Sequence, residues 1–201
     1  MKICYKIKCN EKNLILLNQI HSNKFHLVNN IKKLKSKKIK LKGDAMITDS
    51  KGIALGILTA DCAPIFIYDS KLKIISAVHS GWKGSLKGIT EKVLDFLIKK
   101  GSKKNNLRVV IGPCIGQGSY EIKNDFYNKF TKTNRNNKIF FKTYKKKIYF
   151  DLPRYISYQI KKKGVRNIEL IKKNTFNNKN DFFSARRSLK YKHGDYGRNI
   201  S

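Results

Sequence analysis

Short apolar runs bounded by polar turns recur along the chain, a pattern typical of β-strands. Residues 1–20 alternate apolar and polar positions, which predicts one or two short strands. The lysine-rich stretch 21–43 is expected to hold one strand between loops. Compact apolar runs predict the remaining strands, which are expected at 44–49, 53–58, 64–68, 74–78, 107–111 and 168–172.

Three segments carry a helical pattern instead. Residues 90–100 place apolar side chains among charged ones at helical spacing, and Gly101 is expected to end that helix. Residues 125–130 predict a short helix, which a polar insertion up to residue 138 follows. The segment 148–153 is predicted to begin a further helix, which runs to about residue 163.

The order of these elements predicts an α/β (α+β) fold. Strands outnumber helices and do not alternate strictly with them, which favours mixed β-sheets packed in a sandwich with flanking helices over a doubly wound sheet. The 201 residues suffice for one hydrophobic core, and neither an internal repeat nor a Pro/Ser-rich linker divides them. We therefore expect a single domain over residues 1–201.

The formal net charge of +32 changes the picture less than its size suggests. Such a charge attracts polyanions, but only seven of the 45 basic residues are Arg, the residue that specific nucleic-acid sites favour. The lysines are spread along the whole chain, and Asn and Ile are abundant too, as in proteins from AT-rich genomes. We expect nonspecific adhesion at low salt and no specific nucleic-acid partner.

Membrane-span, signal-peptide and cysteine patterns bear on the cellular compartment of the protein. No apolar run approaches the roughly 20 residues that span a bilayer, and the N-terminus shows no signal-peptide pattern. Cys4, Cys9, Cys62 and Cys114 match neither a CxxC pair nor a small disulfide framework. We expect a cytoplasmic protein without a membrane partner, whose cysteines are free thiols or ligands.

Candidate chemistry gathers between residues 59 and 84. Cys62 and His79 lie 17 residues apart at the edges of predicted strands. Pro64 follows the first, and Gly81 and Gly84 follow the second, so a turn is expected after each. This layout suits either two metal ligands or a thiol with its base.

Short motifs spread over nearly the whole chain carry a family resemblance. They are QIH at 19–21, DA at 44–45, TADCAP at 59–64, VHSGWKG at 78–84, IGPCIG at 111–116, SYE at 119–121, DL at 151–152, FFSARR at 182–187 and GR at 197–198. In this order they resemble the laccase-domain family, also described as multicopper polyphenol oxidoreductase-like and associated with purine nucleoside phosphorylase activity.

The resemblance implies a mixed α/β sandwich that binds zinc, with copper as the alternative ion, through His21, Cys62 and His79. It also implies phosphate-dependent cleavage of purine nucleosides, including methylthioadenosine, and deamination of adenosine. The implied partners are purine nucleosides and phosphate, and the implied assembly is a monomer or homodimer.

The chain departs from the family pattern at several positions. Ala185 stands where the family usually has Tyr, Asn174 where it has Cys, and Lys83 where it has Arg. The segment 188–196 is longer than usual. None of these changes touches the three implied ligands, so they bear on substrate preference and rate instead.

Three protein ligands leave a fourth coordination position open, as in catalytic zinc sites. Zinc lowers the pKa of a bound water and so supplies a nucleophile near neutral pH, which suits attack on C6 of adenosine. Phosphate is expected to bind guanidinium groups, whose paired donors match its oxygens. The candidates are Arg186, Arg187 and Arg198.

Other residues near the motifs allow two interpretations each. Asp61 could shuttle protons or cap a turn, and Cys114 could border the pocket or only lie in a tight turn. Trp82 could stack on a purine, although core packing is favoured. With Cys62 and His79, Asp61 and Cys114 complete the set of catalytic candidates. His26 and His193 belong to no motif and are expected at the surface.

The sequence also allows three rival functions. A cysteine hydrolase would use Cys62 as nucleophile and His79 as base. A copper-dependent polyphenol oxidase could use a His₂Cys set, but multicopper oxidation needs more His ligands than the four in this chain. A nucleic-acid-binding module would bind in a salt-sensitive way, and its binding would survive the loss of Cys62.

Overall fold

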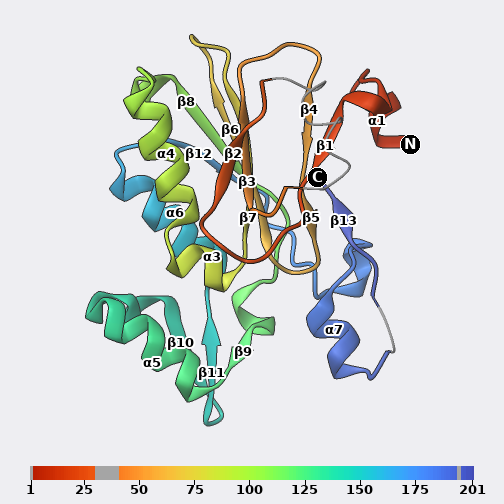
Figure 1. The fold of residues 1–201 in the computed structure, drawn as a ribbon. Helices are drawn as coiled ribbons and strands as arrows, with labels where there is room; N and C mark the ends of the chain where they lie inside the picture. Colours follow the sequence, from red (N-terminus) through yellow and green to blue (C-terminus); the bar gives the residue numbers. More distant parts are fainter. Residues whose placement is uncertain (1, 30–40, 194–195) are drawn as a thin grey trace.

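A six-stranded mixed sheet forms the centre of the computed structural model, which describes residues 2–29, 41–193 and 196–201 (Figure 1). The strand order is β12-β8-β6-β7-β3-β2, and β6 runs antiparallel to both of its neighbours. The outer pairs β2–β3 and β8–β12 are parallel. The strands are β2 (Phe25–Leu27), β3 (Ala45–Thr48), β6 (Ala63–Asp69), β7 (Ile75–Ser80), β8 (Leu107–Ile111) and β12 (Asn167–Leu170).

Two helices, α4 (Ile89–Lys99) and α6 (Leu152–Lys162), pack together and cover one face of this sheet (Figure 1). Each is amphipathic and turns its apolar side inward, because its apolar residues recur at helical spacing. The α4 core residues are Ile89, Val93, Leu94 and Leu97, and those of α6 are Leu152, Tyr155, Ile156 and Ile160.

A small layer covers part of the other face. Its parallel strands are β1 (Leu14–Leu16) and β4 (Ala54–Gly56), and a second apolar cluster lies between this layer and the sheet. The adjoining β5 (Leu58–Thr59) pairs antiparallel with β13 (Asn199–Ile200). The buried residues of this cluster are Leu17, Val28, Met46, Ile57 and Ala77.

An aromatic lobe extends the main core away from the sheet. It comprises α5 (Asn124–Thr133), a 3₁₀ segment (Arg135–Phe140) and a small antiparallel sheet. Phe126 stacks on Phe130 with a centroid distance of 4.8 Å, and Phe130 lies 4.7 Å from Phe150. The strands of this sheet are β9 (Glu121–Ile122), β10 (Phe141–Tyr144) and β11 (Lys147–Phe150).

Short helices connect these layers. The α-helices are α1 (Lys2–Lys6), α3 (Trp82–Leu86) and α7 (Ala185–Lys190), and the 3₁₀ turns are Glu11–Asn13, Lys104–Asn106, Gln117–Ser119 and Asn178–Asn180.

The predicted fold of mixed sheets with flanking helices is confirmed. The strands predicted at 44–49, 64–68, 74–78, 107–111 and 168–172 correspond to β3, β6, β7, β8 and β12. The helices predicted at 90–100 and 125–130 correspond to α4 and α5. The strand predicted within 21–43 is β2, and residues 30–40 of that stretch lie outside the described residues.

Three predictions of elements need correction. Within residues 1–20 one predicted strand is present as β1, but the start of the chain forms helix α1, where the alternating pattern has no sheet face to bury and Tyr5 is 88% exposed. The run 53–58 is split between β4 and β5, which pair with different strands. The helix predicted to begin with the segment 148–153 begins only at Leu152, because Asp151 caps it, and residues 147–150 form β11.

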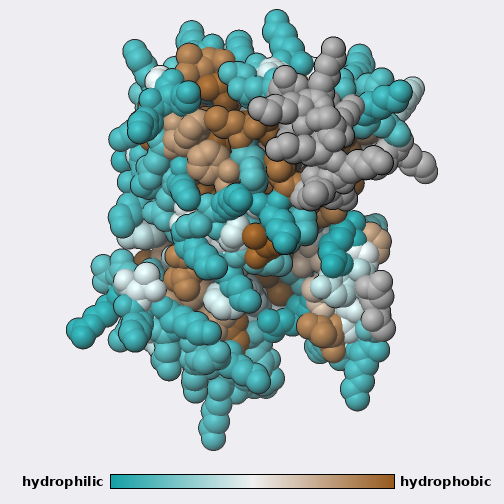
Figure 2. All heavy atoms as spheres, viewed as in Figure 1, coloured by the Kyte–Doolittle hydropathy of each residue, from teal (hydrophilic) through white to brown (hydrophobic). Residues whose placement is uncertain are grey.

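Hydrophilic side chains dominate the face of the molecule in Figure 2. This agrees with the high lysine content of the chain. No described helix combines the length and the apolar character needed to cross a bilayer.

Candidate functional site

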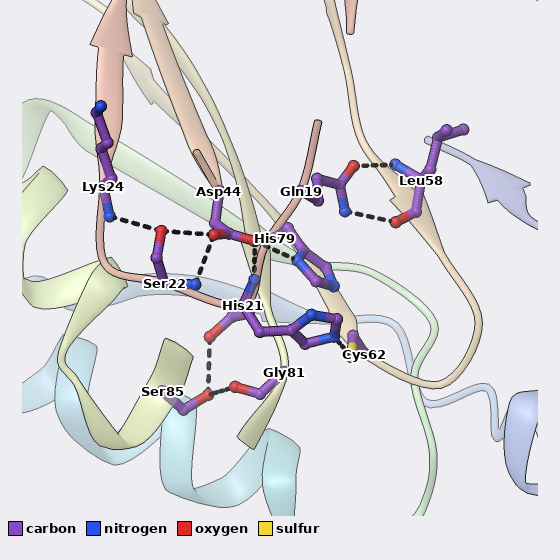
Figure 3. Close-up of polar contacts among 11 residues, drawn as sticks. Gln19, His21, Ser22, Lys24, Asp44, Leu58, Cys62, His79, Gly81 and Ser85 are labelled. Carbon is purple, nitrogen blue, oxygen red and sulfur yellow. Dashed lines mark hydrogen bonds and ion pairs between the residues drawn. The ribbon is translucent and has the colours of Figure 1, made fainter. Parts of the chain in front are cut away.

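Three side chains from distant segments converge at one end of the central sheet (Figure 3). His21 precedes β2, Cys62 lies between β5 and β6, and His79 is on β7. Their potential ligand atoms all lie within 4.8 Å of one another. The Nε2 of His21 is 3.9 Å from the Sγ of Cys62, and the two imidazole rings meet edge-on with a centroid distance of 4.8 Å. We call these three residues the His–Cys–His group.

The backbone around this group adopts less common conformations. His21 itself has φ 56°, and Asp61, directly before Cys62, has φ 85°. Non-glycine residues rarely occupy this left-handed region, and such residues often mark functional sites. His79 pairs with Pro64 across β6 and β7, which brings the turn that carries Cys62 beside it.

Gly81 allows the close approach of these groups. A Cβ atom at this position would lie 2.6 Å from the Sγ of Cys62 and 3.2 Å from the Cδ2 of His21. Any larger residue would therefore displace the thiol or the imidazole. Gly81 also serves as the N-cap of α3, so the chain passes from strand to helix directly behind the group.

Asp44 organises two members of the group. Its carboxylate is fully buried and lies 2.9 Å from Nδ1 of His79, 2.9 Å from the backbone N of His21 and 2.6 Å from the backbone N of Ser22. The Ser22 hydroxyl donates a fourth hydrogen bond at 2.7 Å. A proton on Nδ1 of His79 bonds to Asp44 and leaves Nε2 as the donor for a metal, the usual arrangement of a metal-binding histidine.

These contacts set the charge state of the site. Burial alone would raise the pKa of Asp44, but the hydrogen bonds from His79 and Ser22 hold this pKa at about 2. Desolvation, followed by the charge of nearby His79, lowers the pKa of His21, which favours the neutral imidazole that binds metals. Burial, reinforced by Asp61 and Asp44, raises the pKa of the Cys62 thiol to about 12. Without a nearby cation this thiol stays protonated at neutral pH.

The group fits a transition metal. Tetrahedral zinc with bonds of about 2.0–2.3 Å brings its ligand atoms to about 3.5 Å from one another, close to the 3.9 Å between His21 and Cys62. Two imidazoles and a thiolate suit zinc, and they also suit copper. Three protein donors leave a coordination position for water or substrate.

A cavity of about 460 Å³ opens onto the His–Cys–His group. The side chain of Gln19 closes one wall by bonding both the N–H and the C=O of Leu58, at 2.9 and 2.7 Å. Since Leu58 belongs to β5, which pairs with β13, this contact also anchors the segment that carries Arg198. The other residues that line the cavity are Leu17, Asn18, Lys42, Ala60, Tyr196 and Arg198.

The two remaining catalytic candidates do not line this cavity. The Asp61 carboxylate accepts hydrogen bonds from the Thr175 hydroxyl and from the backbone N–H of Arg186, both at 2.7 Å. Asp61 thus ties α7 and the segment before it to the turn that carries Cys62. Cys114 is buried, and its carbonyl accepts the backbone N–H of Thr175.

The candidate arginines have different environments. The guanidinium of Arg187 donates hydrogen bonds to three backbone carbonyls. That of Arg186 donates to the carbonyl of Glu121 and lies over the Tyr120 ring, at the wall of a second cavity of about 340 Å³. Arg198 lines the cavity of the His–Cys–His group. The carbonyls bound by Arg187 belong to Thr175, Phe176 and Phe182.

The remaining aromatic and histidine candidates lie outside the group. Trp82 packs on Phe126 with a centroid distance of 4.8 Å and borders the second cavity. The Nε2 of His26 lies 2.9 Å from the carbonyl of Lys42, and the residue is partly exposed. His193 is exposed.

Sequence reasoning missed the organising contacts of Asp44, Ser22 and Gln19. Asp44 and Gln19 each fall within a motif, at 44–45 and 19–21, but the motif does not show which atoms they bind. Ser22 directly follows the motif at 19–21. An aspartate placed just before a buried strand was the available signal for Asp44.

Comparisons with known proteins agree with this geometry. A family model described as multi-copper polyphenol oxidoreductase laccase matches residues 1–201. A purine nucleoside phosphorylase of Rickettsia conorii is 36% identical over 179 residues, which cover 88% of this chain and 72% of that protein. An adenosine deaminase from an unknown prokaryotic organism is 32% identical over 93 residues, which cover 46% of this chain and 36% of that protein.

Solved structures share the fold. The crystal structure of the hypothetical protein YfiH of Bacillus licheniformis superposes with a TM-score of 0.88 at 26% identity, covering 99% of this chain and 76% of that one. The structure of YlmD from Geobacillus stearothermophilus gives a TM-score of 0.84 at 21% identity, with the same coverage of both chains.

Proposed function

This chain belongs to the multi-copper polyphenol oxidoreductase laccase family, and on that basis we propose that it is a metal-dependent purine nucleoside phosphorylase that also deaminates adenosine. The observation that carries the proposal is the His–Cys–His group, which lies at the wall of a cavity large enough for a small molecule. Purine nucleoside phosphorylases and an adenosine deaminase among its relatives support the substrate class.

We propose adenosine, inosine, guanosine and methylthioadenosine as substrates, with zinc as the resident metal and copper as the alternative. His21, Cys62 and His79 would hold the ion. When bound, the ion supplies Lewis acidity and makes a water nucleophile available near neutral pH. Residues 1–201 would act as one domain, which the continuous core of sheet, helices and aromatic lobe supports.

The two reactions place different demands on the site. In deamination the oxygen of water bonds to C6 of adenosine, ammonia leaves, and inosine results. In phosphorolysis a phosphate oxygen bonds to C1′ of the ribose while the bond from C1′ to the purine breaks, and the purine keeps the electron pair and gains a proton. Both reactions need a rigid pocket, which the bonds of Asp44 and Gln19 provide.

The rival functions find less support in this geometry. A cysteine hydrolase needs a reactive thiolate, yet burial raises the pKa of Cys62 to about 12. Asp44 bonds Nδ1 of His79 and leaves Nε2 able to serve as a base, so it is the protonated thiol that disfavours a hydrolase. Multicopper oxidation needs further ligands, and among the described residues the only cluster that could hold a metal is the His–Cys–His group.

Product analysis tests the proposal. The purified protein is incubated with adenosine, with and without phosphate, beside the variants Cys62→Ala and Cys9→Ala. We expect adenine with ribose 1-phosphate, and inosine, from the wild type and from the Cys9 variant. The Cys62 variant should lose its bound metal and at least about a hundredfold in rate, because the ion supplies several kcal/mol of transition-state stabilisation. Equal activity in all three proteins would contradict the proposal.

A further inference from the structure

The charged side chains that line the cavity of the His–Cys–His group, among the described residues, are basic. Lys42 and Arg198 both line it. Of the described residues that line the cavity, none is acidic. Two cationic side chains and a metal group would therefore share one small space, and such a site attracts anions.

The nearby carboxylates do not neutralise these cations. Asp44 is fully buried behind the imidazoles, and its four hydrogen bonds come from His21, Ser22 and His79. The carboxylate of Asp61 is bonded to Thr175 and to the backbone of α7. Both carboxylates therefore bind groups of the protein itself, and neither Lys42 nor Arg198 forms an ion pair with an acidic side chain among the described residues.

Arg198 is held in place with part of its guanidinium unused. Its plane lies over the Tyr196 ring at 4.4 Å, and Nη1 donates to the carbonyls of Tyr196 and Gly197 at 2.9 and 3.4 Å. Its Nη2 and Nε atoms have no partner among the described residues. A guanidinium oriented in this way can present two donors to an oxyanion.

The other two candidate arginines are placed differently. The guanidinium of Arg187 donates hydrogen bonds to backbone carbonyls, and Arg186 lies at the second cavity. Neither lines the cavity of the His–Cys–His group. We infer that Lys42 and Arg198 form the subsite that binds inorganic phosphate beside this group. This inference rests on the proposed function, in which phosphate is the second substrate.

The position explains how phosphate would act. Two cations bind the dianion and hold it in the same cavity as the metal group, so that one of its oxygens can reach C1′ of a nucleoside bound there. The bond from that oxygen to C1′ forms as the bond from C1′ to the purine breaks. A phosphate group carried by a nucleotide offers the same chemistry, so the test has to distinguish the two sources.

Calorimetric titration with inorganic phosphate tests the subsite. The proteins are the metal-loaded wild type, Lys42→Met, Arg198→Met and the double variant. The matched control is the double variant Lys51→Met/Arg108→Met, which removes the same two charges from exposed positions outside the cavity. We expect about tenfold weaker binding for each single site variant and about a hundredfold for the double variant, because each removes charge-assisted hydrogen bonds. The control should bind like the wild type.

Three results would overturn the inference. In the first, the control double variant loses as much affinity as the site double variant. In the second, the site double variant binds phosphate like the wild type. In the third, adenosine 5′-monophosphate binds through Lys42 and Arg198 whereas inorganic phosphate does not bind. Thermal melting of every variant shows that each is folded before it is titrated.

The titration is independent of turnover, so it separates this inference from the proposed function. Phosphate binding that depends on Lys42 and Arg198, without phosphorolysis by the wild type, would support the subsite and refute the function. Phosphorolysis whose KM for phosphate is unchanged in the site double variant would support the function and refute the subsite.

Discussion

At the scale of single residues, the candidate site depends on a carboxylate that binds neither metal nor substrate directly. Asp44 fixes the Nδ1 side of His79 and the backbone of His21, so both imidazoles lie in place before any ion arrives. The family motifs identified His21, Cys62 and His79 as candidate metal ligands from the sequence. The role of Asp44 was hidden because its partners lie 23 and 35 positions away, and only the fold brings them together.

Replacing Asp44 by Asn should weaken metal binding. Asn keeps the shape of the side chain but loses the charge and turns a donor toward groups that need an acceptor. We expect an affinity about 10–100-fold lower, the usual effect of removing such a partner from a metal-binding histidine. Competition with a chromophoric chelator measures this affinity.

Asp69→Asn is the matched control. Asp69 is also fully buried and accepts backbone N–H groups, but it ends β6 at the turn toward β7, away from the His–Cys–His group. Both variants should lose stability, and only Asp44→Asn should lose metal affinity. An equal loss of metal affinity in both would show that Asp44 acts through general stability alone.

At the scale of elements, the sequence predicted best where periodicity and glycine agreed. Gly88 and Gly101 bracket α4, and β8 matches its predicted bounds. The hairpin β10–β11 escaped prediction because Lys145 and Lys146 form its turn with φ of 46° and 61°. Two-residue turns of this kind usually carry Asn or Gly, so the ordinary turn signal was missing. Helix α3 was also missed, because it is only five residues long.

The junction between β7 and α3 should not tolerate a side chain at position 81. In Gly81→Ala the new methyl group would press on the Sγ of Cys62. We expect a loss of about 1–3 kcal/mol in the free energy of unfolding. Metal affinity should fall by at least about tenfold, because ligand geometry governs it. Urea denaturation and chelator competition measure the two effects.

Gly118→Ala provides the comparison. No atom lies within 4 Å of a Cβ built at this position, and its φ is not positive. Its stability should stay within about 0.5 kcal/mol of the wild type, with metal affinity unchanged. If Gly81→Ala behaved in the same way, the close approach of residue 81 to Cys62 would affect neither stability nor metal affinity.

At the scale of the whole molecule, composition predicted the character of the surface but not the site. The charge of +32 belongs to the chain as a whole, whereas among the described residues only Lys42 and Arg198 bring positive charge to the wall of the 460 Å³ cavity. Which lysines face a cavity depends on how the layers pack, and no pattern in the sequence encodes that directly. The fold class, in contrast, followed from the order of strands and helices.

The overall charge should produce nonspecific binding to DNA. We expect the affinity for duplex DNA to fall about a thousandfold between 50 and 200 mM salt, as for a protein that contacts about six phosphates. The Cys62→Ala variant should show the same affinity and the same salt dependence. Fluorescence anisotropy measures both. Sequence-selective binding that persists at 200 mM salt would contradict this interpretation.

The three ligand residues lie far apart in the sequence, and this affects the lifetime of the folded protein. Residues 21, 62 and 79 come from separate segments, so one ion would join two long loops as a reversible cross-link. An ion at a hundredfold excess over its dissociation constant adds about 2.7 kcal/mol to the free energy of unfolding. Loss of the ion would remove this added stability, so the protein would unfold and be cleaved by proteases more often when metal is scarce. Metal supply would thus govern the lifetime of the protein as well as its chemistry.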